Sequence, residues 1–144
     1  MLLAIDPGAC TGWAYFVGES LTACGLAPIP QGLSPKKVIV ECPRLRPRGE
    51  RNPNSILLVA REAGEWAGWF GARGAEVQYV TPNDWKGSTS KEIDHVRTER
   101  KLTADERAVL EACFVKTKGR NGMAKKKREN VYDAIGIGLW AVGR

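Results

Sequence analysis

The distribution of apolar and polar positions predicts short strands early in the chain and helices later. Residues 1–5 form an unbroken apolar run, which is typical of a buried strand, and Pro7-Gly8 marks the turn that follows. Other short apolar or β-branched runs predict strands at residues 13–17, 20–26, 38–42 and 76–80. The first three strands are close together in sequence, so we expect them to form an antiparallel meander.

Apolar residues recur at helical spacing through residues 55–70, after Asn54 or Ser55 as a cap. Trp66 and Trp69 widen the apolar face of this helix. The charged segment 89–100 is also predicted to be helical.

The end of the chain predicts two more helices. Thr103-x-x-Glu106 has the pattern of a capping box, which opens a helix that runs to about residue 115. The basic, glycine-interrupted segment 116–128 is expected to be mobile, and a last helix is expected to begin near Asn130.

This order of elements predicts the fold class. An antiparallel meander followed by parallel β-α-β elements indicates an α/β protein with a mixed five-stranded sheet and helices on its faces. The length of 144 residues suits a single domain, 1–144.

Charge changes the picture more than overall composition does. The net charge is +6, and eleven of the 22 basic residues lie in two short segments. These residues are Arg44, Arg46, Arg48, Arg51, Lys116, Lys118, Arg120, Lys125, Lys126, Lys127 and Arg128. Such clustering favours contacts with nucleic-acid phosphates, although a solvated surface is the alternative.

Cysteine and histidine usage argues against a structural zinc site. The four cysteines form no Cys-x-x-Cys pair, and the sequence contains one histidine, His95. We expect reduced thiols, and a solvated surface position for His95 in its charged helix. Without a signal-peptide pattern or a membrane-length apolar run, a cytoplasmic location is expected.

Three acidic residues occupy unusual positions. Asp6 ends the first strand, Glu41 lies within the apolar Val-Ile-Val-Glu-Cys strand, and Asp133 is expected in the first turn of the last helix. If the first and fourth strands are neighbours and the last helix crosses beside them, the three carboxylates converge. Hard oxygen ligands of this kind suit two Mg²⁺ or Mn²⁺ ions, which can hold a phosphate and activate water.

Each acid also has a structural interpretation. Asp6 could hydrogen-bond within its own Asp-Pro-Gly turn, and Asp133 could complement the helix dipole with Asn130 as the N-cap. Glu41 is harder to explain in this way, because a polar side chain within an apolar strand is costly without a partner.

The ordered set of motifs resembles the RuvC class of Holliday junction resolvases, within the ribonuclease H-like superfamily. The resemblance begins with Leu-Ala-Ile-Asp-Pro-Gly at residues 3–8 and continues with Val-Ile-Val-Glu at residues 38–41. It includes Asn-Pro-Asn-Ser at 52–55, Thr-Pro-x-x-Trp-Lys at 81–86, Ser-x-x-Lys at 88–91 and Tyr-Asp-Ala-Ile-Gly-Ile-Gly-Leu at 132–139. These motifs occur in the family's order over almost the whole chain.

The resemblance implies specific roles. Asp6, Glu41 and Asp133 would be catalytic metal ligands, and Lys86 and Lys91 would approach the scissile phosphate. The basic residues after Glu41 would lie at the junction centre, and helix 55–70 would form a homodimer interface. Ordinary core packing is an equal alternative for Trp66 and Trp69.

The sequence departs from the family pattern at Asn130, where resolvases usually carry a second Asp. An amide is a weaker, neutral ligand, so we expect Asn130 to bind one ion weakly, with poor activity in Mg²⁺ and better activity in Mn²⁺. Glu129 points about 100° away on a helix, which makes it a poor substitute.

Three other functions compete with junction cleavage. One is a different nuclease of the same fold, such as a YqgF-like or RNA-cleaving enzyme. Another is a phosphate-binding ATPase of the actin and sugar kinase type, which needs two such domains where 144 residues hold one. The last is a non-catalytic DNA-binding module in which Asn130 marks a decayed site.

Overall fold

The computed structural model describes residues 1–43, 53–116 and 123–144. The sheet is formed by β1 (Leu2–Asp6), β2 (Gly12–Val17), β3 (Ser20–Leu26), β4 (Lys37–Glu41) and β5 (Glu76–Val80). The helices are α1 (Pro53–Gly71), α2 (Pro82–Trp85), α3 (Lys91–Lys101), α4 (Ala104–Lys116) and α5 (Lys125–Ala141).

The five strands form one mixed sheet in the order β3-β2-β1-β4-β5. β1, β2 and β3 pair antiparallel as a meander, whereas β4 is parallel to β1, and β5 is parallel to β4. The predicted α/β class with a mixed five-stranded sheet is therefore confirmed, as is the expectation that the first and fourth strands are neighbours.

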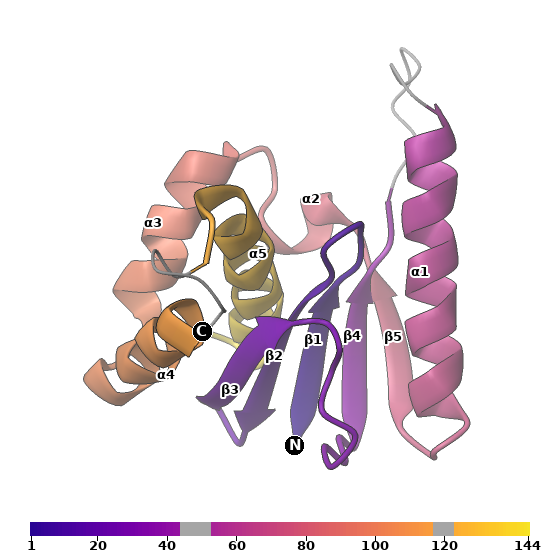
Figure 1. Cartoon of the computed structure of the whole chain (residues 1–144), viewed down its shortest axis with the longest axis horizontal. Coiled ribbons are helices and arrows are strands. Elements are labelled where there is room, and N and C mark those ends of the chain that lie inside the picture. The colour runs from indigo at the N-terminus through magenta and orange to yellow at the C-terminus, as the bar shows by residue number, and fades with distance from the viewer. Residues whose placement is uncertain (44–52, 117–122) are drawn as a thin grey trace.

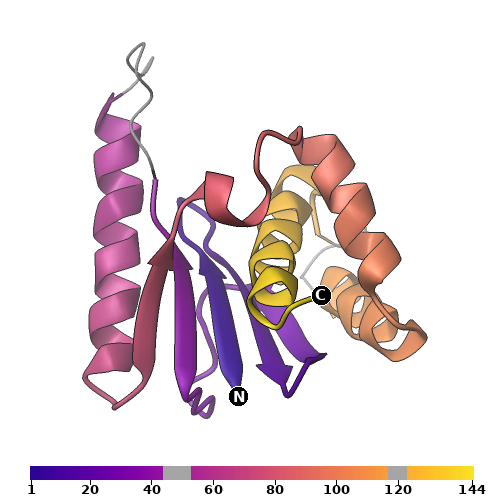
Figure 2. The ribbon, with the colours of Figure 1, turned by 180° about the vertical axis from the view of Figure 1, so that it is seen from behind.

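Helices cover the two faces of this sheet unequally (Figures 1 and 2). α1 alone packs over β4 and β5, while α5 crosses the other face, with α4 packed on β3 and α3 packed against α5. Alternate residues of each strand serve the two faces. Leu3 and Ile5 belong to the core under α1, whereas Ala4 and Ile39 belong to the core under α5.

The predicted strands and the helices α1, α3 and α4 all form, but the last helix begins earlier than expected. α5 starts at Lys125 rather than near Asn130, and its N-cap is Ala124. Asn130 is therefore not an N-cap, and Asp133 lies in the third turn rather than the first. The run of lysines hid the start, because its long side chains are good helix formers without adding an apolar pattern.

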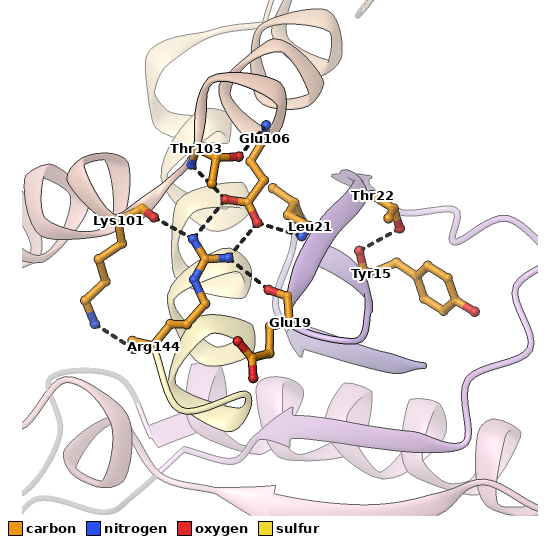
Figure 3. Close-up of polar contacts among 8 residues, drawn as sticks. All are labelled: Tyr15, Glu19, Leu21, Thr22, Lys101, Thr103, Glu106 and Arg144. Carbon is orange, nitrogen blue, oxygen red and sulfur yellow. Dashed lines mark hydrogen bonds and ion pairs between the residues drawn. The ribbon is translucent and has the colours of Figure 1, made fainter.

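The capping box at the start of α4 is confirmed and extends into a larger network (Figure 3). Glu106 Oε2 accepts a hydrogen bond of 2.8 Å from the Thr103 backbone, and Thr103 Oγ1 accepts one from the Glu106 backbone. Both oxygens of Glu106 also accept hydrogen bonds from the Arg144 guanidinium, at 2.6 and 2.9 Å. This bidentate pair joins Arg144, which lies just beyond the end of α5, to the first turn of α4.

None of the helices within the described ranges has the length and apolar character needed to cross a bilayer.

Candidate active site

Two carboxylates lie side by side at the carboxyl ends of β1 and β4, because these neighbouring strands are parallel and in register. Ile5 of β1 pairs with Val40 of β4, so Asp6 and Glu41 are the next residues on adjacent strands. Side chains alternate along a strand, so Asp6 shares the face of Ala4, and Glu41 shares the face of Ile39. Both acids are therefore on the face that α5 covers.

α5 brings the third carboxylate to the same place. Asp133 is 4% exposed and lies in the middle of α5. Its Oδ2 lies 2.9 Å from Lys91 Nζ, and its Oδ1 lies 2.9 Å from His95 Nε2. Lys91 and His95 are one turn apart on α3, so this helix presents two nitrogen groups to a single buried acid.

The pKa shifts show that the three acids share one electrostatic environment. Burial, together with the negative charges of Asp133 and Glu41, raises the pKa of Asp6 well above its usual value. Burial also raises the pKa of Glu41. Burial opposes ionisation of Asp133 too, but its hydrogen bonds to His95 and Lys91 hold its pKa below the usual value.

The short helix α2, which the sequence did not predict, adds Trp85 and Lys86. The Trp85 indole Nε1 donates a hydrogen bond of 2.7 Å to Glu41 Oε2. Lys86 Nζ lies 4.6 Å from the centre of the Trp85 ring. Its positive charge partly offsets the rise in the pKa of Asp6 and Glu41 and helps to lower the pKa of Asp133. A capping interaction between Asp84 and the Thr81 backbone fixes the start of this turn.

The sequence-predicted residues Asp6, Glu41, Asp133, Lys86 and Lys91 therefore gather at one end of the sheet. Sequence reasoning missed Trp85 as a Glu41 partner and was wrong about His95. The His95 side chain is 16% exposed and its ring stacks on Tyr132 at 5.1 Å, so it is not a solvated surface residue. The four-residue spacing of Lys91 and His95 could have indicated their common helical face.

Asn130 has a structural partner in addition to its predicted metal role. Its Nδ2 donates a hydrogen bond of 2.7 Å to the Cys10 carbonyl in the turn between β1 and β2. The same turn approaches α5 so closely that a Cβ on Gly12 would lie 2.0 Å from the Asn130 carbonyl oxygen. Asn130 thus holds the turn after Asp6 against α5, and a carboxylate could not donate this bond.

Four of the predicted DNA-binding residues, Lys125, Lys126, Lys127 and Arg128, form the first turn of α5. The other six, Arg44, Arg46, Arg48, Arg51, Lys118 and Arg120, lie outside the described residues. A cleft of about 470 Å³ runs from this turn to Lys91 and His95. The cleft thus joins the basic start of α5 to the two α3 side chains that contact Asp133.

The donor chemistry of the site fits a divalent ion, although the acids are not arranged around one. Across residues 1–43, 53–116 and 123–144, no three His, Cys, Asp or Glu side chains form a group placed to hold a metal. Carboxylate oxygens are nevertheless the donors that Mg²⁺ and Mn²⁺ prefer. The Lys91 ammonium now supplies the positive charge beside Asp133, so a metal would have to replace part of that contact.

Comparison with known proteins gives a match in structure but none in sequence. No protein-family model and no curated protein matches the chain. A structure of Thermus thermophilus RuvC in complex with a Holliday junction substrate superposes with a TM-score of 0.56, covering 96% of this chain and 89% of that one. The chain has the fold of RuvC.

This RuvC-like fold is the ribonuclease H-type arrangement expected from the sequence, with a mixed sheet flanked by helices. The similarity lies in three-dimensional structure, because the two sequences are only 15% identical. A second T. thermophilus RuvC structure is 16% identical over 96% of this chain and 90% of that one, with a TM-score of 0.49. At these identities the comparison establishes the fold alone.

Proposed function

We propose that this chain is a divalent-metal-dependent endonuclease that cuts branched DNA, with four-way junctions as its substrate. The observation that carries the proposal is the gathering of Asp6, Glu41 and Asp133 beside Lys86 and Lys91 at one end of a RuvC-like sheet. The Holliday junction in the similar T. thermophilus complex supports this choice of DNA.

The three acids would hold two Mg²⁺ or Mn²⁺ ions, which activate water and stabilise the departing oxygen in phosphodiester hydrolysis. Trp85 holds one carboxylate oxygen of Glu41 by a hydrogen bond. This bond fixes the orientation of the carboxylate and therefore the direction of its other oxygen. Lys86 and Lys91 are positioned to attract the phosphate to this edge. His95 and Lys91 orient Asp133 and keep it ionised.

The decisive experiment is cleavage of labelled four-way junctions with Mg²⁺ and Mn²⁺ in parallel. We expect incision of the junction, faster in Mn²⁺, and no incision of a plain duplex of the same sequence. Preferential cleavage of an RNA–DNA hybrid would instead identify a different nuclease of this fold. No cleavage of any of these substrates in either metal would contradict the proposal.

Asn130→Asp tests the predicted weak ligand. An added carboxylate would improve activity in Mg²⁺ relative to Mn²⁺, while the loss of the bond to the Cys10 carbonyl would lower the melting temperature. Asn130→Ala is the matched control, because it removes the bond without adding a ligand. Equal metal preference in all three proteins would exclude Asn130 from the metal site.

A specific observation also supports a non-catalytic DNA-binding function. Asp133 already has two nitrogen partners, at 2.9 Å each, which satisfy its charge without a metal. Asp6→Asn separates the two functions. Loss of cleavage with retained junction binding supports catalysis, whereas full binding by a wild-type protein that never cuts supports the binding module.

A homodimer through α1 is part of the proposal, since symmetric incision of a junction needs two active sites. Trp66 packs into the core beside Phe70, but Leu57, Leu58 and Trp69 are exposed on the outer surface of the helix. Leu57→Glu should shift a dimer toward monomer in sedimentation analysis, because it places a charge within the apolar contact. An unchanged dimer would place the interface elsewhere.

A further inference from the structure

A second cleft lies beside the acidic site and is not used by the proposed reaction. It has a volume of about 340 Å³ and is formed between α2, α3 and α5. Trp85 and Lys86 line it and also contact or influence the carboxylates, so the cleft adjoins the place where a backbone phosphate would bind. Its volume is within the range of small-ligand sites.

The lining of this cleft combines positive charge with aromatic surface. Five basic residues line it, namely Lys86, Arg97, Arg100, Lys101 and Arg144, although the Arg144 guanidinium is already paired with Glu106. Trp85 and Trp140 contribute two indole rings. Cationic groups attract phosphates, and indole rings provide flat surfaces on which nucleobases stack.

Gly136 shapes the wall between the two tryptophans. A Cβ at this position would lie 2.6 Å from the Trp85 ring and 3.3 Å from Thr98 Oγ1. The glycine therefore lets the Trp85 ring lie directly against α5. Trp140 is one turn further along the same helical face, so both rings border the same hollow.

Asp94 provides an independent sign of a ligand. It lines the cleft, is 8% exposed, and its Oδ2 has no hydrogen-bond partner among the described residues. Burial raises the pKa of this carboxyl. A buried polar atom without a partner is costly, which is why such atoms are usually paired or functional.

We propose that this cleft binds an unpaired nucleotide, with its phosphate near the basic side chains, its base against a tryptophan and a base amino group donating to Asp94. Adenine, cytosine and guanine present amino donors at the edge that pairing would otherwise cover. Thymine has no amino group, and its single N3–H donor lies between two carbonyl oxygens that repel a carboxylate. The base must be unpaired because a paired edge could not reach a buried acceptor.

The direct test is calorimetric titration of the metal-free protein with dCMP, dGMP and dTMP. We expect dCMP or dGMP to bind about tenfold more tightly than dTMP, as befits a hydrogen bond to a charged group. Asp94→Asn should reduce that preference toward equality without lowering the melting temperature. Trp140→Ala should weaken all three nucleotides together.

Two substitutions serve as matched controls. Glu99→Gln removes an exposed acid from the same helix, and Tyr79→Ala removes an exposed aromatic ring from β5. Neither should alter binding by more than about twofold. Absence of saturable binding, or equal losses in the control and cleft variants, would overturn the proposal.

The source of the nucleotide is decided by comparing monophosphates with four-residue single strands of dC or dT. Tighter binding of the dC strand than of dCMP, lost in Trp140→Ala, identifies a DNA strand as the source. Binding of monophosphates alone identifies a free nucleotide. The assignment of a DNA strand as the source rests on the proposed nuclease function. The binding measurement needs neither metal nor cleavage, so it tests the cleft even if the nuclease assay fails.

Discussion

α1 and α5 lie on opposite faces of the same sheet and both contain glycines in their interior, yet these residues have different structural importance. In α1, a Cβ on Gly64 or Gly68 would meet no atom within 4 Å. In α5, a Cβ on Gly138 would lie 2.1 Å from the Phe16 ring, and one on Gly136 would meet Trp85. A glycine within a helix therefore indicates close packing only where a neighbouring side chain occupies the position that its Cβ would take.

The same contrast applies to polar groups. α5 carries Asp133 in its buried face, where Lys91 and His95 contact it. The exposed Glu65 of α1 pairs with Arg61, one turn away. α5 thus combines core packing with a buried acid of the candidate site, whereas α1 combines core packing with an exposed apolar surface.

The largest expected difference between the helices is in activity. Asp133→Asn should reduce junction cleavage by roughly 100-fold or more, because it removes a proposed metal ligand and the charge that Lys91 and His95 compensate. Glu65→Gln on α1 should leave cleavage within about twofold, since an exposed pair contributes little. Initial rates in Mn²⁺ measure both, and equal rates for Asp133→Asn and wild type would remove α5 from the chemistry.

Gly138→Ala should lower the free energy of unfolding by about 3 kcal/mol, because the added methyl group overlaps the Phe16 ring. Gly64→Ala should raise it by about 0.5–1 kcal/mol, because alanine is the better helix former where space is open. Urea denaturation of the two variants measures this difference. A similar change in both would mean that α5 packs less closely on β2 than the structure indicates.

An effect of similar size is expected at the end of α5, with a defined pH dependence. Hydrogen bonds from Arg144 lower the pKa of the buried Glu106 carboxyl to about 2. Because its folded-state pKa is below the unfolded value, Glu106 contributes up to about 3 kcal/mol above pH 4.5, and this contribution disappears as pH falls toward 2.

Glu106→Gln should therefore be much less stable than wild type at pH 7, with a difference that narrows in acid. Glu65→Gln should differ from wild type by no more than about 0.5 kcal/mol. Denaturation curves between pH 7 and pH 2.5 test both. A destabilisation by Glu106→Gln that did not change with pH would show that packing and neutral hydrogen bonding, rather than the charge of Glu106, hold α4 against Arg144.

Local patterns in the sequence predicted most of the fold. Strands such as β3 and β5 have apolar and turn residues that define them directly, and the capping box at Thr103 marks the start of α4. The start of α5 was missed because Lys125–Lys127 add no apolar periodicity, and α2 was missed because four residues are too few for any period.

The site was predictable to the extent that its residues were chemically out of place. Glu41 in an apolar strand indicated a partner, and the positions of Asp6 and Asp133, together with the resemblance to RuvC, indicated the other two acids. The contacts of His95, Trp85 and Asn130 were not predictable, because each joins segments far apart in sequence. Charge and hydropathy in a helix do not indicate which neighbour a side chain will meet.

The pairing of Ile5 with Val40 has a consequence for how this chain tolerates change. A shift of β1 by one residue relative to β4 would reverse which side chains of one strand lie on each face of the sheet. One of the two acids would then point toward α1 instead of α5. Insertions within these two strands should therefore abolish the site as a whole, whereas loops of different length at the opposite edge leave the alignment intact. Each backbone hydrogen bond between β1 and β4 thereby helps to keep the carboxylates of the candidate site together.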